Sequence, residues 1–191
     1  MASRQRLSCS EELSRPSDGP EDLSDLQEVL GDLHFLRTAS EGASFVAGLA
    51  MERMRCSMAF AQLYDADQRE FVVLHAVGPN AADAVGFRTQ DRDALLSDAK
   101  RRSRAIMING KDPRVRKGRW AILGGAPRSI LVCSAMHDEK LFGLLEVAHT
   151  AIDAAFRKAD ENALACMAQA FGAFLAKLGP DGVREAMPIK R

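Results

Sequence analysis

Residues 129–150 read SILVCSAMHDEKLFGLLEVAHT, two apolar runs of strand length separated by a short polar segment. The first run is RSILVCSAM (128–136), the second is KLFGLLEVAH (140–149), and His-Asp-Glu lies between them. Apolar runs of this length, bounded by polar turn residues, are typical of buried strands. The segment therefore predicts two adjacent strands near the C-terminal end of the chain.

A second pair of apolar runs lies earlier in the chain. SMAFAQLY (57–64) and EFVVLHAV (70–77) are joined by four polar residues and one alanine, DADQR, which predicts another hairpin. Both faces of the second strand would be largely apolar, so we expect cover on both sides of the sheet. Strict alternation would place four residues on one face: Phe71, Val73, His75 and Val77.

The remaining apolar segments repeat at helical spacing or are short. Helices are expected over 22–39, 42–55, 91–103 and 156–178, and a short strand over 105–108. The element order is helix, helix, hairpin, helix, strand, loop, hairpin, helix. Sequential strands joined by hairpins predict an α+β fold, with a central antiparallel sheet and helices on both faces.

Length and composition suit one domain with tails. The chain has 191 residues, of which 47% are hydrophobic and 27% charged. We expect a single domain over 21–178, a disordered tail over 1–20 because Ser, Pro, Gly and charge dominate there, and a loose tail over 179–191. The N-terminus lacks the apolar core of a signal peptide, and no apolar stretch reaches the roughly 18 residues of a membrane span. We therefore expect a cytoplasmic protein without a membrane partner.

The cysteines indicate neither disulfides nor a metal site. Cys9, Cys56, Cys133 and Cys166 are scattered and form no C-x-x-C pair. Three of them lie among apolar neighbours, which favours buried, reduced thiols. We expect no cofactor and no metal.

Charge is distributed unevenly, although the formal net charge is zero. Residues 100–119 hold nine basic residues and one acid, a net charge of +8, whereas residues 11–32 are acidic. One interpretation is a solvated basic surface that partly pairs with the acidic segment. The other is a site for an anionic ligand or an acidic partner protein. Nucleic acid is disfavoured, because the chain has neither a net basic charge nor a recognisable reading element.

The order of these elements and several local motifs resemble those of the GAF domain, a sensor module of many bacterial signalling proteins. The resemblance covers roughly residues 25–178. It rests on element order, on the hairpin FAQLYDADQREFVVLHAVG, on the strand pair quoted above with Gly143, and on the F-x3-D of Phe156 and Asp160. It implies a central antiparallel sheet with a ligand pocket on one face, and helices on the other face that often join a second copy.

Family activities can be compared with this chain residue by residue. Cyclic-nucleotide-binding members carry Asn-Lys before F-x3-D-E, but His149 and Thr150 stand at that position. The F-x3-D-E remnant is then explained as the start of a helix, with Asp160 and Glu161 near its positive end. The bilin-attaching Cys-His pair and the clustered cysteines of the free methionine sulfoxide reductases are both missing. The chain also has no G-x-S-x-G turn and no G-x4-G-K-[ST] phosphate loop, so we expect no enzyme.

The resemblance makes the segment between the two hairpins the lid of the pocket. Arg104, Arg114, Arg116 and Arg119 would offer forked donors to a phosphate or carboxylate, and Trp120 would stack on a ring. Arg128, Ser129 and His75 complete the expected ligand-binding set. The competing interpretation is that the lid only closes over an apolar core and its charges face water.

Two leucine-rich helix faces predict a homodimer interface. The expected interface residues lie on the first and last helices, side by side on one sheet face: Leu23, Leu26, Leu30, Leu33, Leu164, Met167, Phe171 and Phe174. Alternatively, these stripes only cover the sheet. Together, the sequence predicts a non-catalytic sensory module that binds a small, anionic ligand and acts through a partner signalling protein. The alternative is an adaptor with a closed pocket and charged docking surfaces.

Overall fold

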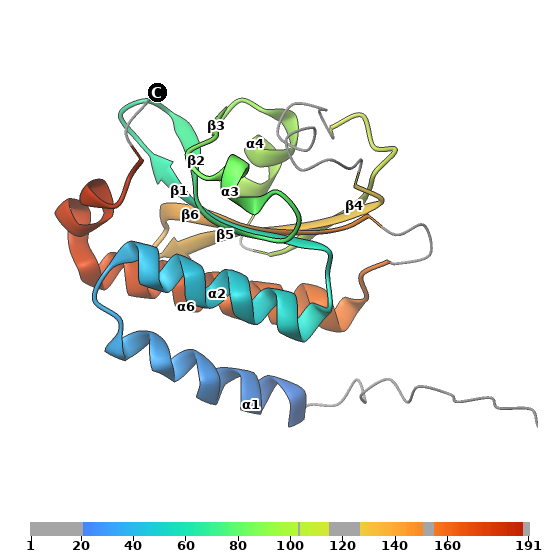
Figure 1. Cartoon of the computed structure of the whole chain (residues 1–191), viewed down its shortest axis with the longest axis horizontal. Helices are drawn as coiled ribbons and strands as arrows, with labels where there is room; N and C mark the ends of the chain where they lie inside the picture. Colours follow the sequence, from blue (N-terminus) through green and yellow to red (C-terminus); the bar gives the residue numbers. More distant parts are fainter. Residues whose placement is uncertain (1–20, 103, 115–126, 151–154, 189–191) are drawn as a thin grey trace, which may run out of the picture.

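The computed structural model describes residues 21–102, 104–114, 127–150 and 155–188 (Figure 1). The helices are α1 (Glu21–Leu30), the 3-10 helix η1 (Gly31–Phe35), α2 (Ala39–Met54), α3 (Ala81–Ala84), α4 (Ala94–Lys100) and α6 (Lys158–Glu185). The strands are β1 (Met58–Asp65), β2 (Glu70–Val77), β3 (Arg88–Gln90), β4 (Ile106–Asn109), β5 (Ser129–His137) and β6 (Lys140–His149).

The six strands form one sheet in the order β3-β2-β1-β6-β5-β4, and every neighbouring pair is antiparallel. This confirms both predicted hairpins and the α+β class. The sequence interpretation missed β3, which pairs with the start of β2. Its three residues, Arg-Thr-Gln, are polar and too few to show any alternation.

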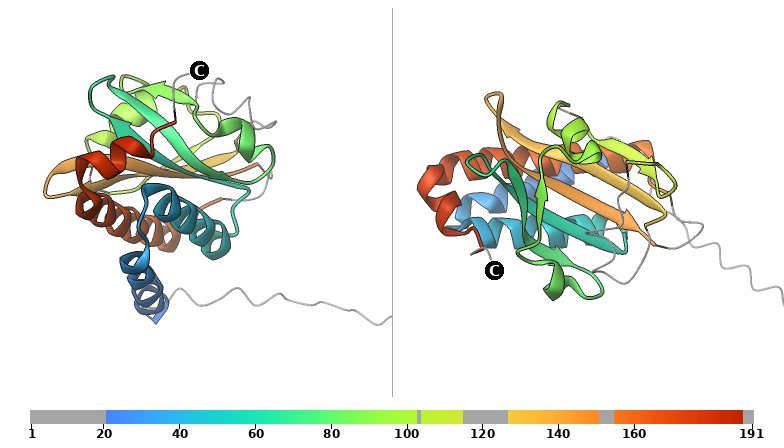
Figure 2. Two further views of the ribbon diagram at one scale, coloured as in Figure 1. Left: turned by 60° about the vertical axis from the view of Figure 1, so that its left-hand side comes forward. Right: turned by 90° about the horizontal axis from the view of Figure 1, so that it is seen from above.

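Helices cover both faces of the sheet (Figures 1 and 2). α2 and α6 lie side by side against one face, called the bundle face below, and α1 lies on their outer side. α3 and α4 lie on the opposite face, called the α4 face. The expected pairing of the first and last helices on the sheet was wrong, because α2 takes the place beside α6.

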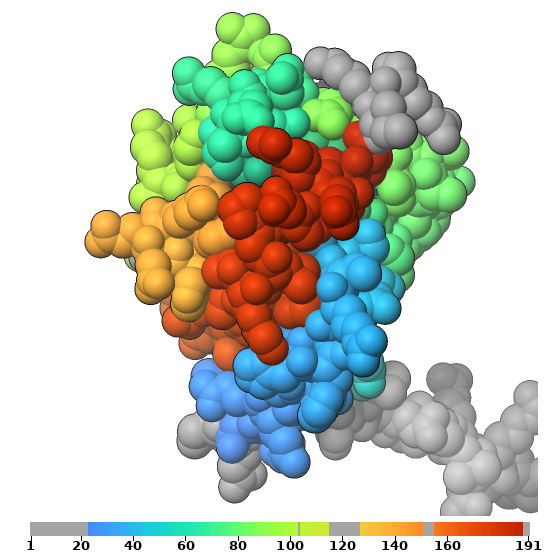
Figure 3. Space-filling model, turned by 90° about the vertical axis from the view of Figure 1, so that its left-hand side faces the viewer, coloured from blue at the N-terminus to red at the C-terminus, as the bar shows by residue number. Residues whose placement is uncertain are grey.

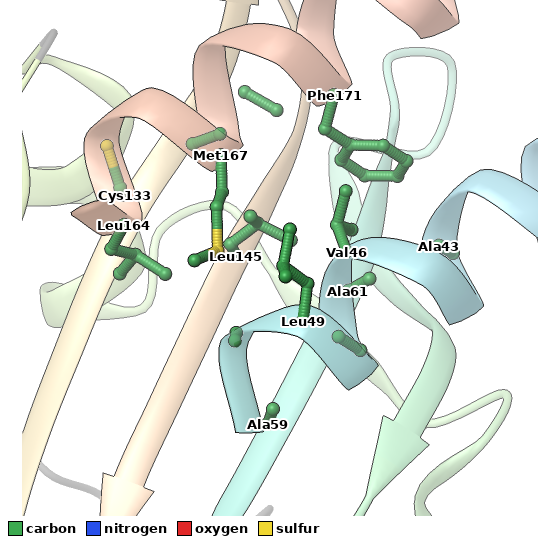
Figure 4. Packing of buried hydrophobic residues seen from close by; sticks show 14 of the residues in the cluster. Ala43, Val46, Leu49, Ala59, Ala61, Cys133, Leu145, Leu164, Met167 and Phe171 are labelled. Atoms are coloured by element: carbon green, nitrogen blue, oxygen red, sulfur yellow. The ribbon is translucent and has the colours of Figure 1, made fainter. Parts of the chain in front are cut away.

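The core has two parts, one on each face of the sheet. On the bundle face, Leu145 of β6 packs with Val46 of α2 and Phe171 of α6, among the residues drawn in Figure 4. On the α4 face, Leu95 and Leu96 of α4 are fully buried in a cluster with apolar side chains of five strands. The sheet is therefore covered on both sides, as the two-faced apolar strands predict.

The expected dimer interface is buried inside the chain. Leu23 is partly exposed, but each of the other seven side chains has 6% or less of its surface accessible: Leu26, Leu30, Leu33, Leu164, Met167, Phe171 and Phe174. A 3-4 spacing of apolar residues is the same for a helix that covers its own core and for a helix that meets a second copy. These seven residues are therefore corrected from interface to core.

The C-terminal segment is part of the domain and not the loose tail that was expected. α6 continues to Glu185 after a kink at Gly179, whose φ of 76° lies in the left-handed region, and Pro180. Beyond the kink, Val183 is buried, and the carbonyl of Pro188 accepts a hydrogen bond of 3.1 Å from Arg88. Figure 3 shows this segment in red against the β1–β2 hairpin.

α6 is the helix in the described ranges that is long and apolar enough, by length and composition alone, to cross a membrane. Its buried side chains, such as Leu164 and Phe171, pack against the sheet and α2. Core helices of this length pass the same test, so the finding does not indicate a membrane span.

We expect removal of residues 180–191 to lower the free energy of unfolding by about 2 kcal/mol, because Val183 loses its burial and Arg88 loses an acceptor. Urea denaturation of the full and shortened chains measures this difference. Arg184→Ala is the matched control, since its pair with Asp67 joins side chains that are 75% and 74% exposed and such pairs contribute about 0.5 kcal/mol or less. Equal stability of the shortened and full chains would contradict the docking of this segment.

Candidate functional site

A bulge in β2 decides which side chains reach the α4 face. Ala61 of β1 pairs with His75, but the next residue, Gln62, pairs with Val73, so Leu74 is an extra residue in β2. His75 thereby shares the bundle face with Ala61, while Val73 shares the α4 face with Gln62. The expected alternation of Phe71, Val73, His75 and Val77 on one face was wrong for this reason.

Two polar side chains lie buried at the centre of the α4 face. Gln62 of β1 and Glu146 of β6 have no accessible surface, and Nε2 of Gln62 donates a 2.9 Å hydrogen bond to Oε2 of Glu146. Oε1 of Gln62 accepts no hydrogen bond from the described residues. Several neighbouring positions on the same face are occupied by apolar residues, among them Phe60 and Leu144.

A second polar cluster joins α4 to the sheet beside this pair. Asp91 is 6% exposed, and its Oδ2 accepts hydrogen bonds from Tyr64 at 3.0 Å and from Lys100 at 2.8 Å. Lys100 also donates to the hydroxyl of Tyr64 at 2.8 Å and lies over its ring, 4.5 Å from the centroid. Nε of Arg69 reaches the same carboxylate at 3.3 Å. The groups satisfy one another, which makes the cluster a clamp between β1, α4 and the segment after β3.

The pKa values of the cluster follow from these contacts. The hydrogen bond from Lys100 lowers the pKa of Asp91 below its ordinary value of 3.8, against the opposing effect of burial. Burial alone would lower the pKa of Lys100, but its bonds to Asp91 and Tyr64 outweigh burial and raise it above 10.5. Both groups are therefore charged at neutral pH.

The predicted ligand-binding arginines do not converge within the described residues. Arg104 and Arg128 are exposed. Arg114 is held by two carboxylates, Asp98 at 2.9 Å and Asp112 at 2.7 Å, and this contact lowers the pKa of Asp112 to about 2. The other three predicted residues lie outside the described residues: Arg116, Arg119 and Trp120.

Ser129 and His75 lie away from the α4 face. Ser129 is buried at the start of β5, and alternation along that strand places it on the bundle face with Leu131 and Cys133. His75 lies on the bundle face because of the bulge in β2, and burial lowers its pKa. The structure therefore places neither residue beside Gln62 and Glu146.

Residues 156–161, which read FRKADE and contain the F-x3-D-E remnant, form the start of a helix, as predicted. Asp160 accepts a 2.6 Å hydrogen bond from the backbone N–H of Arg157, and Lys158 pairs with Glu161. Phe156 is buried, and its ring lies 4.4 Å from that of His149. These contacts stabilise the start of α6.

The described thiols are poor nucleophiles. Burial raises the pKa of Cys56 and of Cys133 to about 12, and it also raises the pKa of Cys166. Since the thiolate is the reactive form, these groups react little at neutral pH. The described residues hold no cluster of three or more His, Cys, Asp or Glu side chains that could bind a metal ion.

No family model matches the sequence, and no curated protein is similar to it in sequence. Solved structures, however, superimpose closely. The GAF domain of a phosphoenolpyruvate-protein phosphotransferase from Coxiella burnetii matches with a TM-score of 0.73 and 16% identity, over 84% of this chain and 96% of that chain. The chain has a GAF fold.

Two further solved structures have a similar fold. The GAF domain of the Acinetobacter phosphoenolpyruvate-protein phosphotransferase gives a TM-score of 0.69 at 17% identity, over 83% of this chain and 95% of the other. The free methionine-R-sulfoxide reductase of Neisseria meningitidis, solved with its substrate, gives 0.69 at 14% identity, over 91% and 96%. At these identities the likeness shows the fold alone.

Sequence reasoning missed the buried pair of this GAF-fold domain. Gln62 and Glu146 lie in strands that are otherwise apolar, as in LLEVAH. A polar residue within an apolar strand was the sequence signal that could have indicated this pair. Polar residues in buried strands are uncommon and are normally paired. The two residues are 84 positions apart, so their contact could be read only from the folded chain.

Proposed function

We propose that this chain is a non-catalytic sensory GAF module, which binds a small molecule on the α4 face and reports through a partner signalling protein in the cytoplasm. The observation that carries the proposal is the Gln62–Glu146 pair, a polar group fully buried at the centre of that face. A purely structural sheet has no need of such a pair, because apolar residues of similar size would pack there at less cost.

The chemistry of the described residues supports a binding role over catalysis. The three described thiols are protonated at neutral pH, and the carboxylate of Asp91 is occupied by three donors. Neither is available as a nucleophile or general base. An anionic ligand remains the expectation for Arg116, Arg119 and Trp120, whereas Arg114 already has its charge matched by Asp98 and Asp112.

The alternative function is an adaptor that acts by protein contact. It is favoured by the same observation on Arg114, because basic residues paired with acids within the chain form a charged surface and not an anion site. In that case the α4 face is a closed core, and no small molecule stabilises the protein.

A thermal-shift screen separates the two functions. Nucleotides, cyclic dinucleotides and small carboxylic acids are tested on the natively purified protein, together with native mass spectrometry for a retained ligand. A ligand at 100 times its Kd is expected to stabilise the fold by about 2.7 kcal/mol. If no compound raises the Tm and no ligand is retained, the sensory function is contradicted and the adaptor is favoured. A shift that disappears in the Arg116→Ala, Arg119→Ala double variant assigns the basic segment to the ligand.

A further inference from the structure

Gln62 is the described residue on the α4 face whose buried side chain has unused hydrogen-bonding capacity. Its amide has no accessible surface, and its Oε1 lacks a donor among the described residues. Nearly all buried polar atoms of native proteins are paired, so an unpaired carbonyl oxygen in a sheet interior requires an explanation.

The orientation of this amide is set by its neighbour. Nε2 of Gln62 donates to Oε2 of Glu146 at 2.9 Å. Rotating the amide by 180° would break this hydrogen bond, because Oε1 is an acceptor and would take the place of the N–H donor. The carboxyl group therefore directs Oε1 of Gln62 away from Glu146.

The residues that pair with Gln62 on the neighbouring strands are apolar. The register places Val73 of β2 and Leu144 of β6 beside Gln62. Nearby, the hydroxyl of Ser134 donates to the carbonyl of Arg102 at 2.7 Å, and Tyr64 is held by Asp91 and Lys100. A group that reaches this part of the α4 face therefore meets an acceptor inside an apolar shell.

We propose that Gln62 is a specificity-determining residue that selects ligands by an N–H or O–H group donated to its Oε1. The end of the ligand that meets the sheet is a compact apolar group with an amide, amine or hydroxyl donor. A phosphate or carboxylate at this position would place lone pairs against Oε1, with the carboxyl group of Glu146 next to it. This inference rests on the proposed ligand-binding function and concerns which end of the ligand meets the sheet.

Matched pairs of probes test the requirement for a donor. Benzamide is compared with N,N-dimethylbenzamide, and indole with 1-methylindole, by calorimetric titration after long equilibration, because the amide of Gln62 is fully buried. We expect the wild-type protein to bind each donor-bearing probe about tenfold more tightly than its methylated partner, the effect of one lost hydrogen bond in a buried site. Equal affinities within the pairs, or no binding of either donor probe, would overturn the proposal.

The variant Gln62→Met removes the acceptor and keeps the length of the side chain. It is expected to bring the affinity ratio within each probe pair close to one, and Gln68→Met, at an exposed position in the β1–β2 turn, is expected to leave the ratio unchanged. An unchanged ratio in a folded Gln62→Met protein overturns the assignment. If this variant does not fold, the affinity ratios of the wild-type protein within the two probe pairs test the proposal on their own. An anion that raises the Tm of wild type and Gln62→Met equally would refute this inference while supporting the ligand-binding function.

Discussion

Gly143→Ala is expected to lower the free energy of unfolding by about 3 kcal/mol, the upper part of the range for overpacked interiors. Gly143 lies in β6 opposite Leu63 of β1. A Cβ built on it would overlap the carbonyl oxygen of Gln62 and lie 3.1 Å from the carbonyl carbon of that residue. These are backbone atoms in the middle of the sheet, so they cannot move aside without breaking the ladder. Chemical denaturation measures the difference.

The matched control is Gly48→Ala in α2. A Cβ at Gly48 meets no atom within 4 Å, and replacing a helical glycine by alanine is expected to stabilise by about 0.5–1 kcal/mol. The two substitutions add the same methyl group. If they change the free energy of unfolding in opposite directions, the loss at Gly143 is due to the close approach of β1 and β6. A loss below about 1 kcal/mol at Gly143 would show that the sheet yields there.

Asp91→Ala is expected to destabilise the domain by about 3 kcal/mol, because it leaves Tyr64 and Lys100 without their common acceptor. Asp91 is 6% exposed, whereas the side chain of Lys100 is 33% exposed and regains part of its hydration, which limits the loss. Asp67→Ala is the control, since Asp67 and its partner Arg184 are both largely exposed. Similar losses for the two variants would contradict the clamp role of the Asp91 cluster.

The pH dependence gives this prediction a second readout. The pKa of Asp91 in the folded protein lies below its ordinary value of 3.8, chiefly because Lys100 donates to it. The carboxylate therefore contributes stability above about pH 4. That contribution is lost as the pH falls through the lower, folded-state value. The stability difference between wild type and Asp91→Ala should consequently be constant near neutral pH and shrink in acid. A difference that stays constant down to pH 2 would contradict the pairing.

Much of the fold could be predicted because its signals are local. Both hairpins were expected within one or two residues of their observed bounds, and β6 was expected at 140–149, where the structure has it. The GAF resemblance rested partly on Gly143, and the close approach of β1 to β6 supplies the physical reason for a glycine there. The segments with apolar residues at helical spacing were also correctly predicted to be helices, but the surfaces against which they pack were not predicted correctly.

The candidate site was far less accessible to sequence reasoning. The basic stretch suggested an anion site, but Arg114 is matched by Asp98, sixteen residues earlier, and the charge count could not reveal that pair. The helical stripe of Leu164 and Phe171 could not distinguish cover by α2 from cover by a second copy. In both cases the sequence pattern identified one residue set of a contact, but it did not identify the residues on the other side.

The amino-acid sequence by itself determined where most of the strands and helices lie and that both sheet faces are apolar, because repeats of two and of 3.6 residues arise within a single segment. Only the tertiary structure decided which side chains meet. One extra residue in β2, Leu74, moves His75 to the bundle face. The pairing of β1 with β6 brings Gln62 against Glu146 across 84 residues. Such contacts depend on register and packing between distant segments, which no local pattern specifies.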